Sequence, residues 1–215
     1  QINGIVNEYI HVEKPDQEAV PSRQFDISKI DFDLLSREFA HTRRKNLLLR
    51  DLDELVNQQL AKMLFANPQR IDYYDRYQEI IDAYNAEQNR ATIEKTFMDL
   101  MELASSLDTE QQRYVREGFS SDEELSVYDL LFSENLTKQE IETIKKVSVD
   151  LLTKIKQQIA KLDHWTDKQE TKAIVDNLIR KTLWQELPNS YDVSDIQTYQ
   201  KKIYEYVYMR YPEVA

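Results

Sequence analysis

The chain has no cysteine among its 215 residues, which excludes disulfides and thiolate metal sites. Glycine and proline are also scarce, with two and five residues respectively. A fold rich in tight turns and β-hairpins needs many more of both, because they supply the backbone angles of such turns. The sequence therefore predicts an all-α protein.

Long apolar runs are missing as well. No window approaches the roughly 18 consecutive apolar residues of a membrane span. The first residues, QINGIVNEYIHVEKPD, lack the basic start and apolar segment of a signal peptide. With no cysteine to oxidise, these features predict a cytoplasmic protein that does not contact a membrane.

Negative charge is abundant but unevenly distributed. Residues 98–134 hold ten acidic residues against two arginines, a balance of -8 within a total of -11. Residues 137–181 have a net positive charge, with ten Lys or Arg against seven Asp or Glu. This distribution excludes a nucleic-acid footprint over the whole surface and leaves a local polyanion contact open.

Helical periodicity begins near residue 28. Residues 1–27 include Gly4 and two prolines, show no such period, and predict a linker or the tail of an upstream domain. Residues 28–215 predict one helical domain, an irregular bundle of about seven or eight helices without a strand. Ser28 or Asp31 is the expected first N-cap, and Pro68 and Pro188 are expected to end helices.

Four later helix starts show the capping-box pattern, in which a hydroxyl residue precedes Glu or Gln by three positions. The four pairs are Ser121 with Glu124, Thr137 with Glu140, Thr166 with Gln169, and Ser194 with Gln197. The last helix also carries Tyr204, Tyr206 and Tyr208 around its circumference. This distribution predicts burial against a second surface, of another subunit or domain, and is less typical of a base-stacking groove.

The sequence contains no catalytic, phosphate-binding or metal-binding motif in the structural context that such a site needs. Two distant glycines cannot form a phosphate-binding loop, and His11, His41 and His164 lack metal-ligand spacing. Asp150, Glu170 and Lys172 follow the residue order of metal-dependent nucleases, but their flanks predict helices where those enzymes need strands. We therefore predict no catalytic, cofactor-binding or metal-ligating residue.

One basic cluster interrupts the helical pattern, in the segment FAHTRRKNLLLRDL. It consists of Arg43, Arg44 and Lys45. The apolar stripe changes direction here, which predicts a polar joint, either a kink or a change of packing partner, with Asn46 turned inward. Arg50 is expected to pair with Glu54. Contact of the three basic residues with DNA or with a partner protein is the alternative.

Several segments, in their order along the chain, resemble the C-terminal helical region of the restriction (motor) subunit of type I restriction-modification enzymes. They are DFDLLSREFAHTRRKN, LAKMLFANPQRIDYYDRYQEIIDAYN, ATIEKTFMDLMEL, DEELSVYDLL, LTKQEIETIKKVSVDLLTKI and DHWTDKQETKAIVDNLIRKTLWQELP. The most specific stretch runs from NPQRID to IIDAYN. Residues 1–27 would then be the tail of the motor region or a linker from it.

The resemblance implies a role without a catalytic site. The parent subunit of that family is an ATP-dependent DNA translocase and site-specific endodeoxyribonuclease that uses ATP and Mg, and its catalytic motifs have no matching positions here. This region is expected to be a non-catalytic helical assembly domain without a cofactor. It would dock the motor onto the methyltransferase and specificity subunits and pack on the motor domains, meeting DNA through the parent complex. A direct duplex-DNA-binding module is the alternative.

Overall fold

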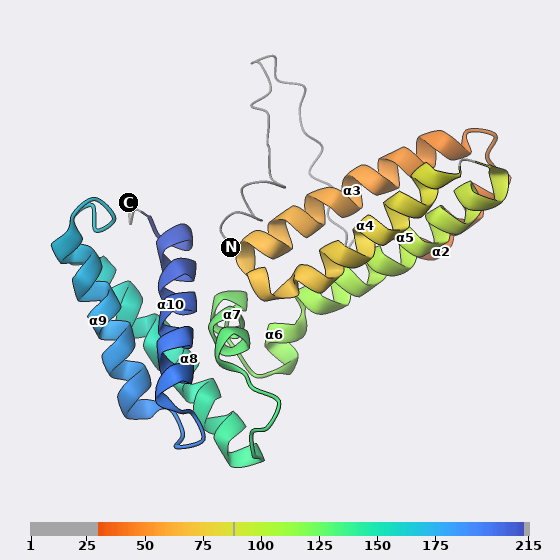
Figure 1. Ribbon diagram of the computed structural model, residues 1–215. Coiled ribbons are helices and arrows are strands. Elements are labelled where there is room, and N and C mark those ends of the chain that lie inside the picture. The colour runs from red at the N-terminus through yellow and green to blue at the C-terminus, as the bar shows by residue number, and fades with distance from the viewer. Residues whose placement is uncertain (1–29, 88, 213–215) are drawn as a thin grey trace. The chain divides into compact units, whose positions relative to one another are not determined.

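A computed structural model of the chain describes residues 30–87 and 89–212, and Figure 1 shows their arrangement. These described residues form nine α-helices and one short 3₁₀ helix, with no strand. The predicted all-α fold is confirmed, whereas the predicted linker over residues 1–27 lies outside the described part of the chain. Among the helices described, none has both the length and the apolarity to cross a bilayer.

The described residues gather into two compact units. The N-terminal unit contains residues 30–65 and 70–110, and the C-terminal unit contains residues 66–69 and 111–212. The chain therefore passes between the units at three places, after residues 65, 69 and 110. Each unit has its own apolar core.

Four helices build the N-terminal unit: α2 (Phe32–His41), α3 (Lys45–Ala66), α4 (Ile71–Ala86) and α5 (Arg90–Gln111). All four contribute buried side chains to one core. Phe39 of α2 stacks on Phe97 of α5 with ring centroids 3.6 Å apart. Asp31, one of the two predicted N-caps, caps α2 by accepting a hydrogen bond from the Leu34 N–H.

The basic cluster is the break between α2 and α3. Thr42 leaves the helix with an extended backbone, and α3 begins afresh at Lys45. The predicted polar joint is thus a real kink, but two of its details were wrong. Asn46 is exposed, and Arg50 lies 3.7 Å from Asp51. Because helix phase is not carried across the break, the stripe of α2 does not project onto Asn46.

Five helices build the C-terminal unit: α6 (Arg113–Arg116), α7 (Asp122–Leu131), α8 (Lys138–Ile159), α9 (Gln169–Glu186) and α10 (Val193–Arg210). The last four form a closed bundle, in which each helix packs on the next and α10 returns to α7. Figure 1 shows α9 lying beside α8 and α10. The short helix α6 packs on α7.

Two of the four predicted helix starts are correct. Ser121 caps α7 by accepting from the Glu124 N–H, although the Glu124 carboxylate bonds to the N–H of Ser120. Thr137 and Glu140 form the complete capping box of α8. Both satisfy backbone groups that a helix start would otherwise leave open.

The other two predicted starts were wrong. Helix α10 is capped by Asp192 and Asp195, a capping box two residues upstream of the predicted Ser194. Helix α9 has Lys168 at its N-cap and no side-chain cap bond there. The hydroxyl of Thr166 donates instead to the carbonyl of Pro212, at 3.2 Å. A tertiary partner has therefore replaced the local one.

The tyrosines of α10 serve the core of their own unit. Tyr206 is almost wholly buried, and burial raises its pKa to about 12. Tyr204 packs edge-on against the buried Trp165, with ring centroids 6.2 Å apart. Tyr208 is the most exposed of the three, at 39%, and also meets Trp165 edge-on. Most of this aromatic surface is thus used inside the bundle.

Candidate functional site

The three predicted contact residues do not share one environment. The Lys45 Nζ lies 2.6 Å from a Glu94 carboxylate oxygen and 4.9 Å from the centre of the Phe39 ring. Arg43 and Arg44 have exposed side chains, and the backbone N–H of Arg44 donates to the Thr42 hydroxyl at 3.1 Å. Lys45 is therefore held within its own unit. Contact of the cluster with DNA or a partner stays a prediction.

Replacement of Lys45 with alanine should lower the melting temperature of the chain by a few degrees. The change removes the Glu94 ion pair and the cation over the Phe39 ring. Arg44→Ala is the matched control, because it removes a neighbouring exposed cation. Thermal unfolding followed by circular dichroism measures both, and an equal shift in the two variants would contradict a structural role for Lys45.

The basic stretch from 137 to 181 also stabilises the fold. Three of its ten basic residues form ion pairs: Lys145 with Glu117, Lys154 with Glu186, and Lys156 with Glu123. A fourth, Lys172, lies over the ring of Tyr208. These side chains serve different helix contacts and do not form one row along a groove.

The acidic residues of 98–134, which we call the acidic block, also form ion pairs within the fold. At least five of its ten acids pair with basic residues: Glu102 with Arg76, Glu110 with Arg70, Glu117 with Lys145, Glu123 with Lys156, and Asp129 with Arg113. Most of these pairs join different helices. The local negative charge thus supplies cross-links within the two units, which composition alone did not predict.

Glu123 shows how this environment acts on an acid. Burial raises the pKa of its carboxyl, but the hydrogen bond from Lys156 and the charges of Lys156 and Arg210 outweigh burial. The net effect is a pKa below the ordinary 4.5. A lowered folded-state pKa stabilises the folded chain above pH 4.5, and that contribution is lost as pH falls through the folded value.

Acid should therefore weaken the wild-type chain more than a Glu123→Gln variant. Wild-type stability is expected to fall more steeply as the pH drops below about 4.5, because only the wild type must protonate this carboxylate. Urea unfolding at a series of pH values measures the difference. Parallel pH profiles for the two proteins would show that Glu123 carries no such linkage.

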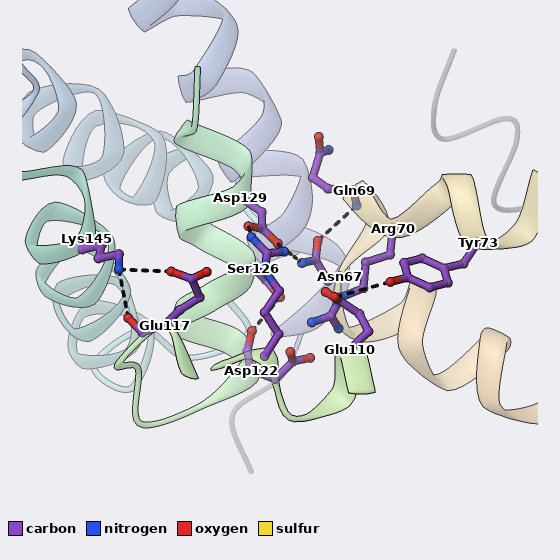
Figure 2. Close-up of polar contacts among 11 residues, drawn as sticks. Asn67, Gln69, Arg70, Tyr73, Glu110, Glu117, Asp122, Ser126, Asp129 and Lys145 are labelled. Atoms are coloured by element: carbon purple, nitrogen blue, oxygen red, sulfur yellow. Dashed lines mark hydrogen bonds and ion pairs between the residues drawn. The ribbon is translucent and has the colours of Figure 1, made fainter. Parts of the chain in front are cut away.

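A buried polar cluster lies in the C-terminal unit, around the short segment 66–69 (Figure 2). We call it the Asn67 cluster, and its members are Asn67, Arg113, Ser126 and Asp129. Asn67 is fully buried and donates to an Asp129 carboxylate oxygen at 2.7 Å. Arg113 donates to both Asp129 oxygens, at 3.0 and 2.9 Å.

The rest of the Asn67 cluster binds the backbone. The Asn67 side-chain oxygen accepts from the N–H of Gln69 at 3.1 Å, so it caps the 3₁₀ helix η2 (Pro68–Arg70). The Ser126 hydroxyl is shared between the carbonyls of Ala66 and Asp122, at 2.9 and 2.8 Å. The short segment 66–69 is thereby fixed to α7.

A second buried pair lies in the N-terminal unit (Figure 2). Arg70 is only 4% exposed, and its Nε donates to a Glu110 carboxylate oxygen at 3.0 Å. The Tyr73 hydroxyl donates to the other Glu110 oxygen at 3.5 Å. Burial, and then the charge of Glu110, raise the pKa of Tyr73. The tyrosine therefore stays a neutral hydrogen-bond donor.

These polar groups hydrogen-bond to one another and to the backbone of their own unit. The Asp129 carboxylate faces a guanidinium and an amide, so its charge is already neutralised and hydrogen-bonded. Within the ranges described, no three His, Asp or Glu side chains are placed to hold a metal ion. Within the C-terminal unit, a buried network of this kind fixes the segment 66–69 to α7.

Sequence reasoning missed every member of the Asn67 cluster. The available signal was Asn67 itself, a small polar residue that follows an apolar stripe and precedes Pro68. Its partner Asp129 lies 62 residues away and was seen only as part of the acidic block. Notably, the cluster begins inside the NPQRID string on which the family resemblance chiefly rested.

The nuclease-like triplet and the described histidines lie in helices or in the turns between them, as the sequence predicted. Asp150 is exposed on α8, and Glu170 and Lys172 lie in the first turns of α9, so the nuclease-like triplet has no strand to sit on. His41 ends α2, and His164 has a positive φ of 44° in the turn before α9. His11 lies outside the described residues.

The described residues thus form an all-α fold in which several ion pairs join helices of the same unit. The chain belongs to the family described as "Type I restriction enzyme HindI endonuclease subunit-like, C-terminal", which matches residues 17–211. The resemblance found in the sequence is thereby confirmed. No curated protein and no solved structure matches the chain.

Proposed function

We propose that this chain is the helical assembly region of a type I restriction motor subunit. It docks the motor onto the methyltransferase and specificity subunits and packs on the motor domains of the same polypeptide. The observation that carries the proposal is the family match over residues 17–211. The parent subunit, a cytoplasmic ATP-dependent translocase and endodeoxyribonuclease, would hold ATP and Mg in its other domains.

The pattern of exposed and paired side chains supports an assembly role. Ion pairs of the acidic block stabilise each unit internally. Large apolar side chains, in contrast, remain exposed on several helices, including Trp184 and Val115. Single exposed apolar residues are common on protein surfaces, but aromatic residues such as Trp184 are enriched at surfaces that another protein covers.

Direct duplex binding is the less supported alternative. It would rest on Arg43 and Arg44 and on the basic residues of 137–181, of which three are already ion-paired. Duplex affinity that depends on phosphate contacts needs many unpaired cations along one groove. The described arrangement favours a protein partner.

Gel filtration of this chain mixed with the methyltransferase–specificity core tests the proposal. We expect co-elution of the chain with the core, and no ATPase or nuclease activity in the chain alone. The intact motor subunit is the positive control. Separate elution of a folded chain, when the intact subunit co-elutes, would contradict the assembly role.

A further inference from the structure

Helix α9 has one fully buried face. Val175, Ile179 and Leu183 are inaccessible to solvent, and they point into the core of the C-terminal unit. They recur at four-residue spacing, which places them on one side of the helix. This side packs on α8 and α10 (Figure 1).

The opposite face of α9 combines apolar and basic side chains. We call it the α9 outer face, and its members are Ile174, Asn177, Arg180, Lys181 and Trp184. At 100° per residue these five fall within a sector of about 120°, away from the buried side. Ile174 is 43% exposed and Trp184 is 59% exposed.

The exposure of Trp184 contrasts with that of the other tryptophan. Trp165 is 1% exposed and donates its ring N–H to a backbone carbonyl. Trp184 leaves a large apolar ring in water, where burial would be favourable. Tryptophan and arginine are the residues most enriched among those that dominate binding at protein interfaces.

The cations of the α9 outer face have no acidic partner. Arg180 donates to the Asn177 side-chain oxygen at 3.0 Å, and among the described residues neither Arg180 nor Lys181 forms an ion pair. Between Ile174 and Trp184 the only acid is Asp176, one turn before Arg180, and its carboxylate accepts from Gln200 at 2.8 Å and forms no ion pair with Arg180. On the adjacent α8, three of the five lysines are paired.

We propose that the α9 outer face is the docking surface for a protein partner, with Trp184 as its anchor. The partner surface has an apolar socket for the indole ring, rimmed by Asp or Glu residues that meet Arg180 and Lys181. Charge complementarity carries this assignment, because the two cations stand unpaired in a chain of net charge -11. The inference rests on the proposed function and places the socket on the methyltransferase–specificity core.

Duplex DNA fits this surface less well. Two cations offer few phosphate contacts. An exposed indole and an isoleucine on the same face would gain little from a hydrated phosphate backbone. The mixture of an aromatic anchor and flanking cations instead matches a protein interface with a charged rim.

The test measures how tightly three forms of this chain bind the methyltransferase–specificity core. Trp184→Ala is expected to weaken binding at least about tenfold, because it empties the socket. The double variant Arg180→Glu, Lys181→Glu should weaken binding similarly and reduce its dependence on salt. Met98→Ala, which truncates an exposed side chain of the N-terminal unit, is the matched control and should leave affinity unchanged.

The outcomes separate this inference from the proposed function. If the wild-type chain binds the core and the Trp184 and charge-reversal variants bind equally well, the docking surface is wrong and the assembly role stands. If the folded wild-type chain does not bind the core, the proposed function itself is wrong. If the variants lose affinity for duplex DNA while core binding is unchanged, the α9 outer face contacts nucleic acid and the inference is overturned.

Discussion

Replacing Trp165 with alanine is expected to lower the free energy of unfolding of the C-terminal unit by about 4 kcal/mol. The side chain is 1% exposed and lies in the turn between α8 and α9. Its Nε1 donates to the Tyr211 carbonyl at 2.6 Å, and its ring meets Tyr204 and Tyr208 edge-on. Truncation leaves a cavity and also an unpaired carbonyl. Urea unfolding followed by circular dichroism measures the loss.

The second tryptophan supplies a matched control. Trp184→Ala removes the same ring from an exposed position and should change stability by no more than about 0.5 kcal/mol. Trp165→Phe keeps most of the ring and loses the N–H, so an intermediate loss of about 2 kcal/mol is expected. Equal losses at Trp165 and Trp184 would contradict the assignment of Trp165 to the core.

Replacing Asp129 with alanine should destabilise the C-terminal unit by about 3 kcal/mol. The carboxylate accepts from Arg113 and from the fully buried Asn67. Without it, the amide of Asn67 loses a partner in a place that water does not reach. A buried donor left without its acceptor costs more than the lost bond itself.

Asp150→Ala is the control for Asp129, since it removes an exposed aspartate from the same unit and should be nearly neutral. A double-mutant cycle with Asn67→Ala should then give a coupling energy of about 1 to 2 kcal/mol. Additive effects would mean that Asn67 and Asp129 stabilise the unit independently, and the Asn67 cluster would not act as a network.

Local chemistry predicted the helical elements well. Asp31, Ser121 and Thr137 begin helices because their side chains satisfy backbone N–H groups three residues on. Helix α3 ends just before Pro68 and α9 just before Pro188, as the missing N–H of proline requires. Each of these features depends only on residues a few positions apart.

Tertiary contacts account for what the sequence did not predict. Thr166 has the spacing of a cap, yet its hydroxyl bonds to Pro212, 46 residues away. The Asn67–Asp129 and Arg70–Glu110 pairs join residues 62 and 40 positions apart. Nothing in local spacing selects these partners from the many acids of the chain. Such pairs become visible only when the helices are packed.

The basic cluster illustrates the same limit. Its position marked a real break between α2 and α3, because the apolar stripe changes phase there. The sequence could not show what its side chains contact, since the partners of Lys45 are Glu94 and Phe39, which come from other helices. The α9 outer face was missed because the segment that contains Trp184 was predicted only to be a helix, with no account of which of its side chains are exposed.

Competition with the intact motor subunit tests the assembly role most directly. Fluorescently labelled motor subunit is bound to the methyltransferase–specificity core, and this chain is added while fluorescence anisotropy is recorded. The proposal predicts that the chain displaces the labelled subunit in a saturable manner. A folded chain that leaves the anisotropy unchanged, while unlabelled motor subunit lowers it, would contradict docking through this region.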